Sequence, residues 1–150
     1  MRHRTILIAV AIMGVLAAGA IVAVIVFTAW STPPAALTQP TWTLTRLVSD
    51  GQEQALSPSQ PATLRFGARD GQVSGSGGCN GFGGAYTLHG SQLRIGTLTS
   101  TAIGCLDPVV GEQESHYYAA LPRVTTYRLD GGTLTLSGDN GEVELTFHAS

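Results

Sequence analysis

Hydrophobic positions divide the chain into one continuous apolar run and a longer part in which apolar and polar residues alternate. The run covers residues 6–30, a stretch of 25 residues that carries no charge. A helix of that length rises about 37 Å, whereas the hydrocarbon core of a bilayer is about 30 Å thick. We therefore expect residues 6–30 to form a transmembrane signal-anchor helix.

The charges on either side of this run predict its orientation. Arg2 and Arg4 precede it, and the next basic residue is Arg46. By the positive-inside rule, residues 1–5 lie in the cytoplasm and the rest of a single-pass membrane protein lies outside. The alternative is a protein secreted after signal-peptide cleavage. The run is longer than the 7–15 apolar residues usual in a signal peptide, which favours the anchor.

Residues 31–40, STPPAALTQP, interrupt both patterns. Their prolines disfavour helix and strand alike. This segment is predicted to be an extended Pro-rich linker, which leaves residues 41–150 as the folded extracytoplasmic domain.

Most of this domain has the two-residue alternation of half-buried strands. The clearest part is the end of the chain, where alternating apolar positions are separated by Asp130-Gly131-Gly132 and Asp139-Asn140-Gly141. Asp-Gly and Asn-Gly favour the positive φ angles of tight hairpins. We predict an antiparallel meander of three strands. Earlier strands are expected around Trp42–Leu44 and within residues 62–68, 85–89 and 92–95.

One segment, residues 107–121, has helical periodicity instead. Asp107 can cap the helix, Pro108 suits its first position, and Pro122 ends it. Its apolar stripe contains one carboxylate: Val110, Glu114, Tyr117 and Leu121 share a face. The predicted fold class is α+β, a small antiparallel barrel-like or strongly curved sheet with one helix inserted before the C-terminal meander.

Charge excludes one large class of function. Residues 41–150 hold six arginines against ten acidic residues, a net charge of about −4, and the chain has no lysine. A nucleic-acid-binding domain would need a basic patch. We therefore expect no nucleic-acid partner.

The glycine-rich segment 75–84, GSGGCNGFGG, could suggest a phosphate loop. A P-loop needs a lysine, and the dinucleotide pattern that begins at Gly75 and Gly77 has Asn80 where its third glycine should be. We interpret the glycines as positions of positive φ or close packing. Asn80 is expected to bond its own backbone in a turn.

Cys79 and Cys105 are the only cysteines. In an oxidising compartment they favour a disulfide, and two buried free thiols are the alternative. Their spacing is not that of a zinc site, and no nucleophile elbow or paired carboxylates occur. No catalytic residue, metal or cofactor is predicted. Glu114 is either a candidate ligand contact or a buried carboxylate bonded to an arginine or to backbone amides.

At these residues the chain resembles the META domain (HslJ-like) family. The opening Trp42 and Leu44, the G-C-N-x-x-x-G-x-Y segment, T-x-x-x-C and E-x-x-Y carry the resemblance. The chain departs from many members at Ile103-Gly104, where they have methionine and alanine. The family positions, structural or binding, are Gly75, Gly78, Asn80, Gly84, Tyr86, Thr101, Glu114, Tyr117 and Leu121.

The resemblance implies a small α+β domain outside a membrane, in a family linked to heat stress, drug tolerance, secretion and motility, with no established enzymatic activity. We expect a non-enzymatic, membrane-tethered domain that acts in cell-envelope or stress homeostasis by binding an unknown envelope protein. The alternative is a domain that binds a small hydrophobic ligand in the mouth of the curved sheet, with Glu114 as its polar contact.

Overall fold

The computed structural model describes residues 33–150, which lie within a compact unit spanning Thr32–Ser150. The predicted cytoplasmic residues 1–5 and the predicted anchor 6–30 lie outside the described residues. Within residues 33–150, none of the helices has the length and apolar character needed to cross a membrane.

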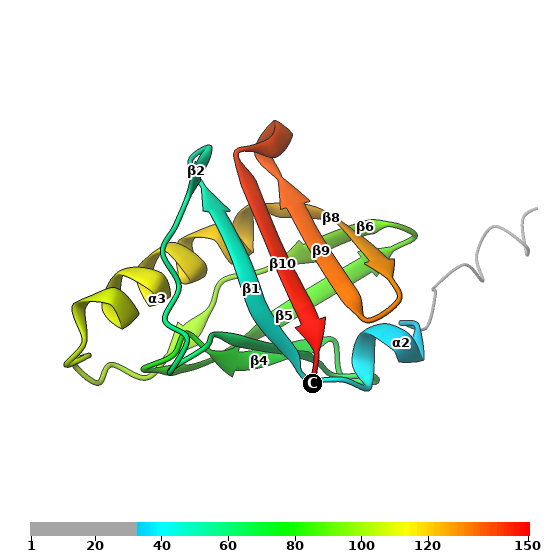
Figure 1. Cartoon of the computed structure of the whole chain (residues 1–150). Helices are drawn as coiled ribbons and strands as arrows, with labels where there is room; N and C mark the ends of the chain where they lie inside the picture. Colours follow the sequence, from blue (N-terminus) through cyan, green and yellow to red (C-terminus); the bar gives the residue numbers. More distant parts are fainter. Residues whose placement is uncertain (1–32) are drawn as a thin grey trace, which may run out of the picture. The chain divides into compact units, whose positions relative to one another are not determined.

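The domain is an antiparallel barrel closed by its first and last strands (Figure 1). This arrangement confirms the predicted α+β, barrel-like fold class. Two short strands lie off the ring: β2 (Gln52–Glu53) pairs with β1, and β7 (Thr99–Ser100) pairs with β5. Around the ring the order is β1 (Trp42–Ser49), β3 (Thr63–Phe66), β4 (Gln72–Ser76), β5 (Gly81–His89), β6 (Gln92–Ile95), β8 (Val124–Asp130), β9 (Thr133–Gly138) and β10 (Val143–Ala149).

The closing pair, β1 and β10, runs antiparallel from Trp42↔Ala149 to Val48↔Glu144. A register shift between Leu44 and Arg46 leaves Thr45 as a bulge, and the Thr45 hydroxyl donates to the Thr146 carbonyl at 3.1 Å. Bulges sharpen the local bend of a strand, which a small barrel needs in order to close.

The barrel interior is filled with apolar side chains. The alternation predicted for the C-terminal meander decides which residues point inward, so Leu134 and Leu136 of β9 are fully buried. Tyr117 reaches the core from the helix, and its ring centroid lies 6.3 Å from that of Phe147. The other fully buried large side chains are Trp42, Leu37, Leu47, Leu64, Leu93, Leu121 and Leu145, together with Gln113.

The helix that sequence predicts is α3 (Pro108–Ala120), followed by the 3₁₀ turn η1 (Leu121–Arg123). The Asp107 carboxylate accepts from the backbone N–H of Val109 at 2.9 Å, which confirms the predicted cap. The apolar stripe, including Glu114, is buried along its length. The meander is also confirmed, with a left-handed residue, Gly131, in its first turn and the 3₁₀ turn η2 (Asp139–Gly141) as its second.

The extended linker predicted for residues 31–40 is wrong where the structure describes it. Residues Ala35–Thr38 form a short helix, α2, which lies on the side of the barrel away from α3 (Figure 1). Leu37 is fully buried, and the Trp42 indole N–H donates to its carbonyl at 2.9 Å. Because these tertiary contacts outweigh the influence of the nearby prolines, the folded domain begins near residue 35 rather than 41.

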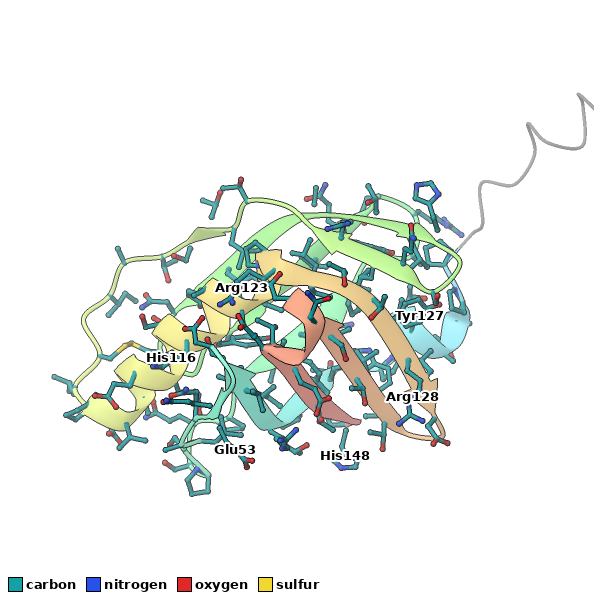
Figure 2. The ribbon with its side chains drawn as sticks, turned by 90° about the horizontal axis from the view of Figure 1, so that it is seen from above. Glu53, His116, Arg123, Tyr127, Arg128 and His148 are labelled. Atoms are coloured by element: carbon teal, nitrogen blue, oxygen red, sulfur yellow. A yellow bond between two sulfur atoms is a disulfide. The ribbon has the colours of Figure 1, made fainter. Side chains whose placement is uncertain are left out.

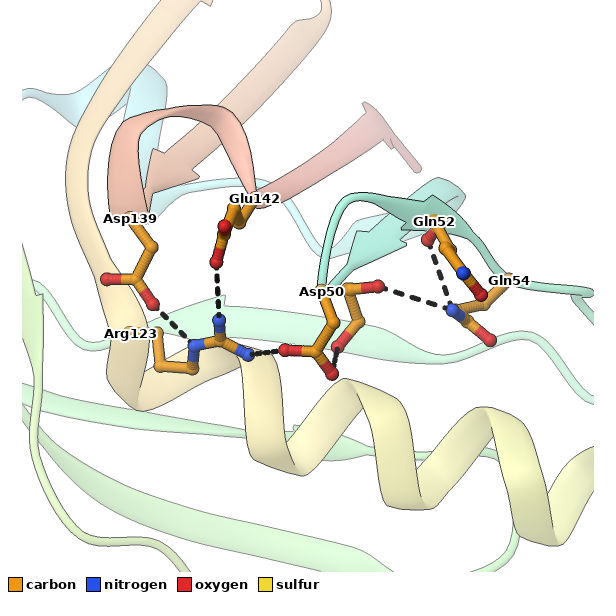
Figure 3. Close-up of polar contacts among 7 residues, drawn as sticks. Asp50, Gln52, Gln54, Arg123, Asp139 and Glu142 are labelled. Carbon is orange, nitrogen blue, oxygen red and sulfur yellow. Dashed lines mark hydrogen bonds and ion pairs between the residues drawn. The ribbon is translucent and has the colours of Figure 1, made fainter.

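Arg123 holds two turns together at one end of the barrel (Figure 3). Its guanidinium donates to Asp50, in the β1–β2 turn, at 2.7 Å and to Asp139, in η2, at 2.5 Å. Glu142 lies 3.8 Å away. The hydrogen bond from Arg123 holds the pKa of Asp50 below its usual value, and the bond to Asp139 raises the pKa of Arg123.

Replacing Arg123 with glutamine should therefore raise the pKa of Asp50 toward 3.8, its usual value. A depressed carboxyl pKa contributes stability above the unfolded value and loses that contribution as pH falls through the folded value. The stability difference between wild type and Arg123→Gln should accordingly shrink as pH falls below about 3.8. NMR titration of the Asp50 carboxyl carbon measures the first effect, and urea unfolding at several pH values measures the second.

Arg128→Gln is the matched control, because Arg128 pairs with Asp130 at 3.4 Å and both side chains are more than 70% exposed. It should leave the pKa of Asp50 unchanged. An unchanged Asp50 pKa in Arg123→Gln would contradict the conclusion that the hydrogen bond from Arg123 lowers it.

Candidate functional site

Four of the nine family positions, Gly78, Asn80, Thr101 and Glu114, meet at the four-residue turn 77–80, which joins β4 to β5 and packs against α3. Gly78 has a φ of +115°, in the left-handed region that favours glycine. A Cβ at Gly77 would lie 2.5 Å from Cγ of Glu114. The glycines are therefore needed for the turn and for the close approach of the helix, as sequence predicts.

Glu114 fastens the helix to this turn. Its side chain is buried, and its Oε2 accepts from the backbone N–H groups of Asn80 at 2.6 Å and Cys79 at 3.3 Å. Its Oε1 accepts from the Asn80 side-chain amide at 2.7 Å. Of the roles considered for Glu114, the structure shows the carboxylate bonded to backbone amides and no bond to an arginine among residues 33–150.

Asn80 connects the turn to a third segment. Its Oδ1 accepts from the Thr101 hydroxyl at 2.8 Å and from the Ile103 backbone N–H at 2.7 Å, and its Nδ2 donates to the Ile103 carbonyl at 3.0 Å. The prediction that this side chain bonds its own backbone is wrong. Apart from Sγ of the neighbouring Cys79, its partners lie more than twenty residues away, because β7 brings the segment that contains Thr101 alongside the turn.

A disulfide joins Cys79 to Cys105, across a Cα–Cα distance of 5.8 Å. The predicted disulfide is therefore confirmed, and the alternative of two free thiols is wrong. It is the yellow bond beside the start of α3 in Figure 2. Both cysteines are partly exposed, and Sγ of Cys105 lies 3.8 Å from Oε1 of Glu114. The two sulfurs and a Glu114 oxygen lie within 4.8 Å of one another. Cysteine spacing in the sequence does not show this grouping of metal-ligating atoms.

Two further side chains of α3 bind the same turn and are absent from the sequence-based site. The Tyr118 hydroxyl donates to the Asn80 carbonyl at 2.5 Å and accepts from the Gly77 N–H at 3.1 Å. Burial, and then the charge of Glu114, raise the pKa of Tyr118 to about 12. Gln113 donates to the Gly77 carbonyl at 2.7 Å and accepts from the Ser57 N–H at 2.7 Å. Gln113 lies on the buried face of α3, three residues after Val110, and Tyr118 is partly buried beside it. An analysis that follows only the apolar positions of the helix leaves both out.

The remaining family positions have packing roles away from the carboxylate. A Cβ at Gly75 would lie 2.0 Å from the Thr63 carbonyl, and one at Gly84 would lie 3.0 Å from the Leu98 side chain. The Tyr86 hydroxyl donates to the Gly67 carbonyl at 2.7 Å. Tyr117 donates to the Thr63 carbonyl at 3.1 Å, and Leu121 is fully buried.

Three large apolar side chains lie within four residues of Cys105 in the sequence and are exposed to solvent. Ile103 is 66% exposed, Leu106 is fully exposed and Val109 is 43% exposed. We call these three residues the apolar rim. Because they flank a disulfide-bonded and hydrogen-bonded segment, the rim is an exposed apolar surface on a fixed support.

The barrel, helix α3 and the turn 77–80 make up a small α+β domain with an enclosed apolar core. A META domain family model matches residues 35–150, so the chain belongs to the META domain family. The match begins at α2, in agreement with the start of the fold.

Solved structures share the fold. A protein from Burkholderia xenovorans, solved by NMR, is 31% identical over 77% of this chain and 86% of its own, with a TM-score of 0.62. A second NMR structure is 24% identical over 79% of this chain and 95% of its own, with a TM-score of 0.58. A DUF4847 family protein from Bacteroides vulgatus is 15% identical over 75% of this chain and 93% of its own, with a TM-score of 0.55. A search of curated proteins gives no match.

Proposed function

We propose that this chain is a non-enzymatic, membrane-tethered extracytoplasmic domain that binds a protein partner of the cell envelope through the apolar rim, in envelope or stress homeostasis. The observation that carries the proposal is the exposure of Ile103, Leu106 and Val109 beside the disulfide. Exposed large apolar side chains that form a patch on a folded surface mark sites of protein interaction. The tether is the apolar run 6–30.

A binding role agrees with how the polar groups of the site are used. Both oxygens of Glu114 accept hydrogen bonds from the turn, so the carboxylate holds the turn to the helix. The Tyr118 phenol, with a pKa of about 12, stays protonated near neutral pH and is a poor general base. These groups support a rigid surface rather than proton transfer.

The alternative, a small hydrophobic ligand in the barrel mouth, has less support. Glu114 would be the polar contact of such a site, and its oxygens face the turn 77–80. An open hollow of about 600 Å³ lies over β4, β5 and β7. Because it is shallow, it would bury only a small part of a ligand, whereas ligand sites commonly enclose most of the ligand's surface.

The test is site-specific photo-cross-linking of the full-length protein in its own membranes. A photoreactive residue at Leu106 should give one discrete adduct with an identifiable envelope protein, whereas one at exposed Arg128 on β8 should not. Excess purified protein should compete for that adduct, and Leu106→Asp protein should not compete. Equal adducts from both positions, or equal competition by Leu106→Asp, would refute binding through the rim. Native mass spectrometry that finds a bound lipid-sized molecule and no adduct at Leu106 would support the alternative.

A further inference from the structure

The grouping of Cys79, Cys105 and Glu114 supports a role that is independent of the proposed partner binding. We infer that reduction of the Cys79–Cys105 disulfide by a dithiol converts this site into a binding site for a thiophilic divalent cation such as Zn²⁺. Two thiolates and one carboxylate would be the protein ligands, and water would complete the coordination.

One distance in the disulfide form is already close to that of a metal site. With Zn–S near 2.3 Å and Zn–O near 2.0 Å, a tetrahedral site places sulfur and oxygen about 3.5 Å apart. Sγ of Cys105 lies 3.8 Å from Oε1 of Glu114. The two sulfurs would separate to about 3.8 Å, which side-chain rotation can provide once their bond is broken.

Glu114 has an acceptor position left for a metal. Its Oε1 accepts one hydrogen bond at normal distance, from Nδ2 of Asn80 at 2.7 Å, and a carboxylate oxygen offers two lone-pair directions. Asn80 is itself fixed by Thr101 and Ile103. A ligand carboxylate held by hydrogen bonds in this way is typical of metal sites, where outer partners orient the ligand.

Charge explains why a cation belongs here after reduction. Two thiolates beside the Glu114 carboxylate would place three negative groups within 4.8 Å of one another. Like charges this close repel one another. A divalent cation removes that repulsion, and thiolate ligands favour Zn²⁺ over the harder Mg²⁺ and Ca²⁺. The partly exposed cysteines leave a path for the cation and for water.

The reaction balances as a thiol–disulfide exchange followed by metal uptake. A thiolate of the dithiol attacks one sulfur, the Cys79–Cys105 bond breaks, and a mixed disulfide forms. The second thiol of the reductant then attacks the mixed disulfide. The reductant leaves as an intramolecular disulfide and both cysteines become thiols, so two electrons pass from the dithiol to the cysteine pair. Zn²⁺ then replaces the two thiol protons, which pass to solvent.

The test uses full-length protein in detergent, reduced with a water-soluble phosphine because a dithiol would compete for metal. Co²⁺ is the spectroscopic probe, and Zn²⁺ displaces it. The reduced chain should take up one Co²⁺ with a thiolate-to-cobalt charge-transfer band, and the oxidised chain should show none. Zn²⁺ should bind the reduced form at least about 100-fold more tightly than the oxidised form, because two of the ligands exist only after reduction.

Cys105→Ser leaves a single cysteine. Its charge-transfer band should therefore be no stronger than that of one thiolate bound to cobalt. Glu114→Gln should weaken Zn²⁺ binding about tenfold or more, whereas Glu112→Gln, exposed on the same helix, should leave it unchanged. A reduced wild-type chain with native circular dichroism and no thiolate–cobalt band would overturn the inference without recourse to any variant. Equal affinities in Glu114→Gln and wild type would overturn the assignment of the carboxylate ligand.

Discussion

Replacing Glu114 with alanine is expected to lower the free energy of unfolding by about 3–4 kcal/mol, because it removes the charged acceptor shared by several buried donors. The backbone N–H of Asn80, 2.6 Å from Glu114 Oε2, would lose its partner in a buried position. The Asn80 side-chain amide would lose its bond to Oε1 in the same substitution. Urea unfolding followed by tryptophan fluorescence measures the change, since Trp42 lies in the core.

Glu112→Ala is the matched control, because Glu112 lies two residues away on the exposed side of α3. It should change the free energy of unfolding by no more than about 0.5 kcal/mol. The loss of unfolding free energy in Glu114→Gln should fall between those of the two alanine variants. The glutamine side chain keeps one acceptor oxygen, but its NH₂ group would face the N–H groups that the second carboxylate oxygen now accepts from. A loss below about 1 kcal/mol in Glu114→Ala would show that water replaces the carboxylate at little cost, and the structural role would be refuted.

Removing the disulfide with Cys79→Ser and Cys105→Ser together is the second large effect. The two cysteines are 26 residues apart in sequence. Opening a loop of that size should cost about 3–4 kcal/mol in the chain-entropy model. For a domain of this size the melting temperature should fall by about 10–20 °C, measured by circular dichroism without added metal.

The wild-type protein supplies the comparison for this pair of substitutions. Reduction should lower the melting temperature of the wild type toward that of the double variant and leave the double variant unchanged. Equal melting temperatures for oxidised wild type and double variant would mean that the bridge adds nothing to a turn already held by Glu114, Tyr118 and Gln113.

The parts of the fold that sequence predicts are those with strong local signals. Asp107 and Pro108 define the start of α3 through a cap and a fixed φ, both of which depend on neighbouring residues alone. The C-terminal strands are predicted by alternation and by glycine in the turn at Gly131. Barrel closure is predicted only as a class, because the pairing of β1 with β10 depends on residues about one hundred positions apart.

The parts that sequence misses are decided by tertiary contacts. A four-residue helix at 35–38 has no nucleation advantage of its own, and it forms where Leu37 is buried and Trp42 donates to it. Asn80 has the turn preference that suggested a local bond, yet burial brings it partners from two distant segments. The Cys79–Cys105–Glu114 grouping likewise depends on a turn, a loop and a helix meeting.

The pairing of β1 with β10 also affects the order in which the chain can fold. A ribosome or an export channel releases β1 before the other strands of the barrel. Its partner β10 is complete only when residue 149 has emerged. The barrel therefore cannot close before β10 has emerged. Until then one edge of β1 is unpaired, so the interval before the seven residues of β10 emerge is when this domain most needs protection from aggregation.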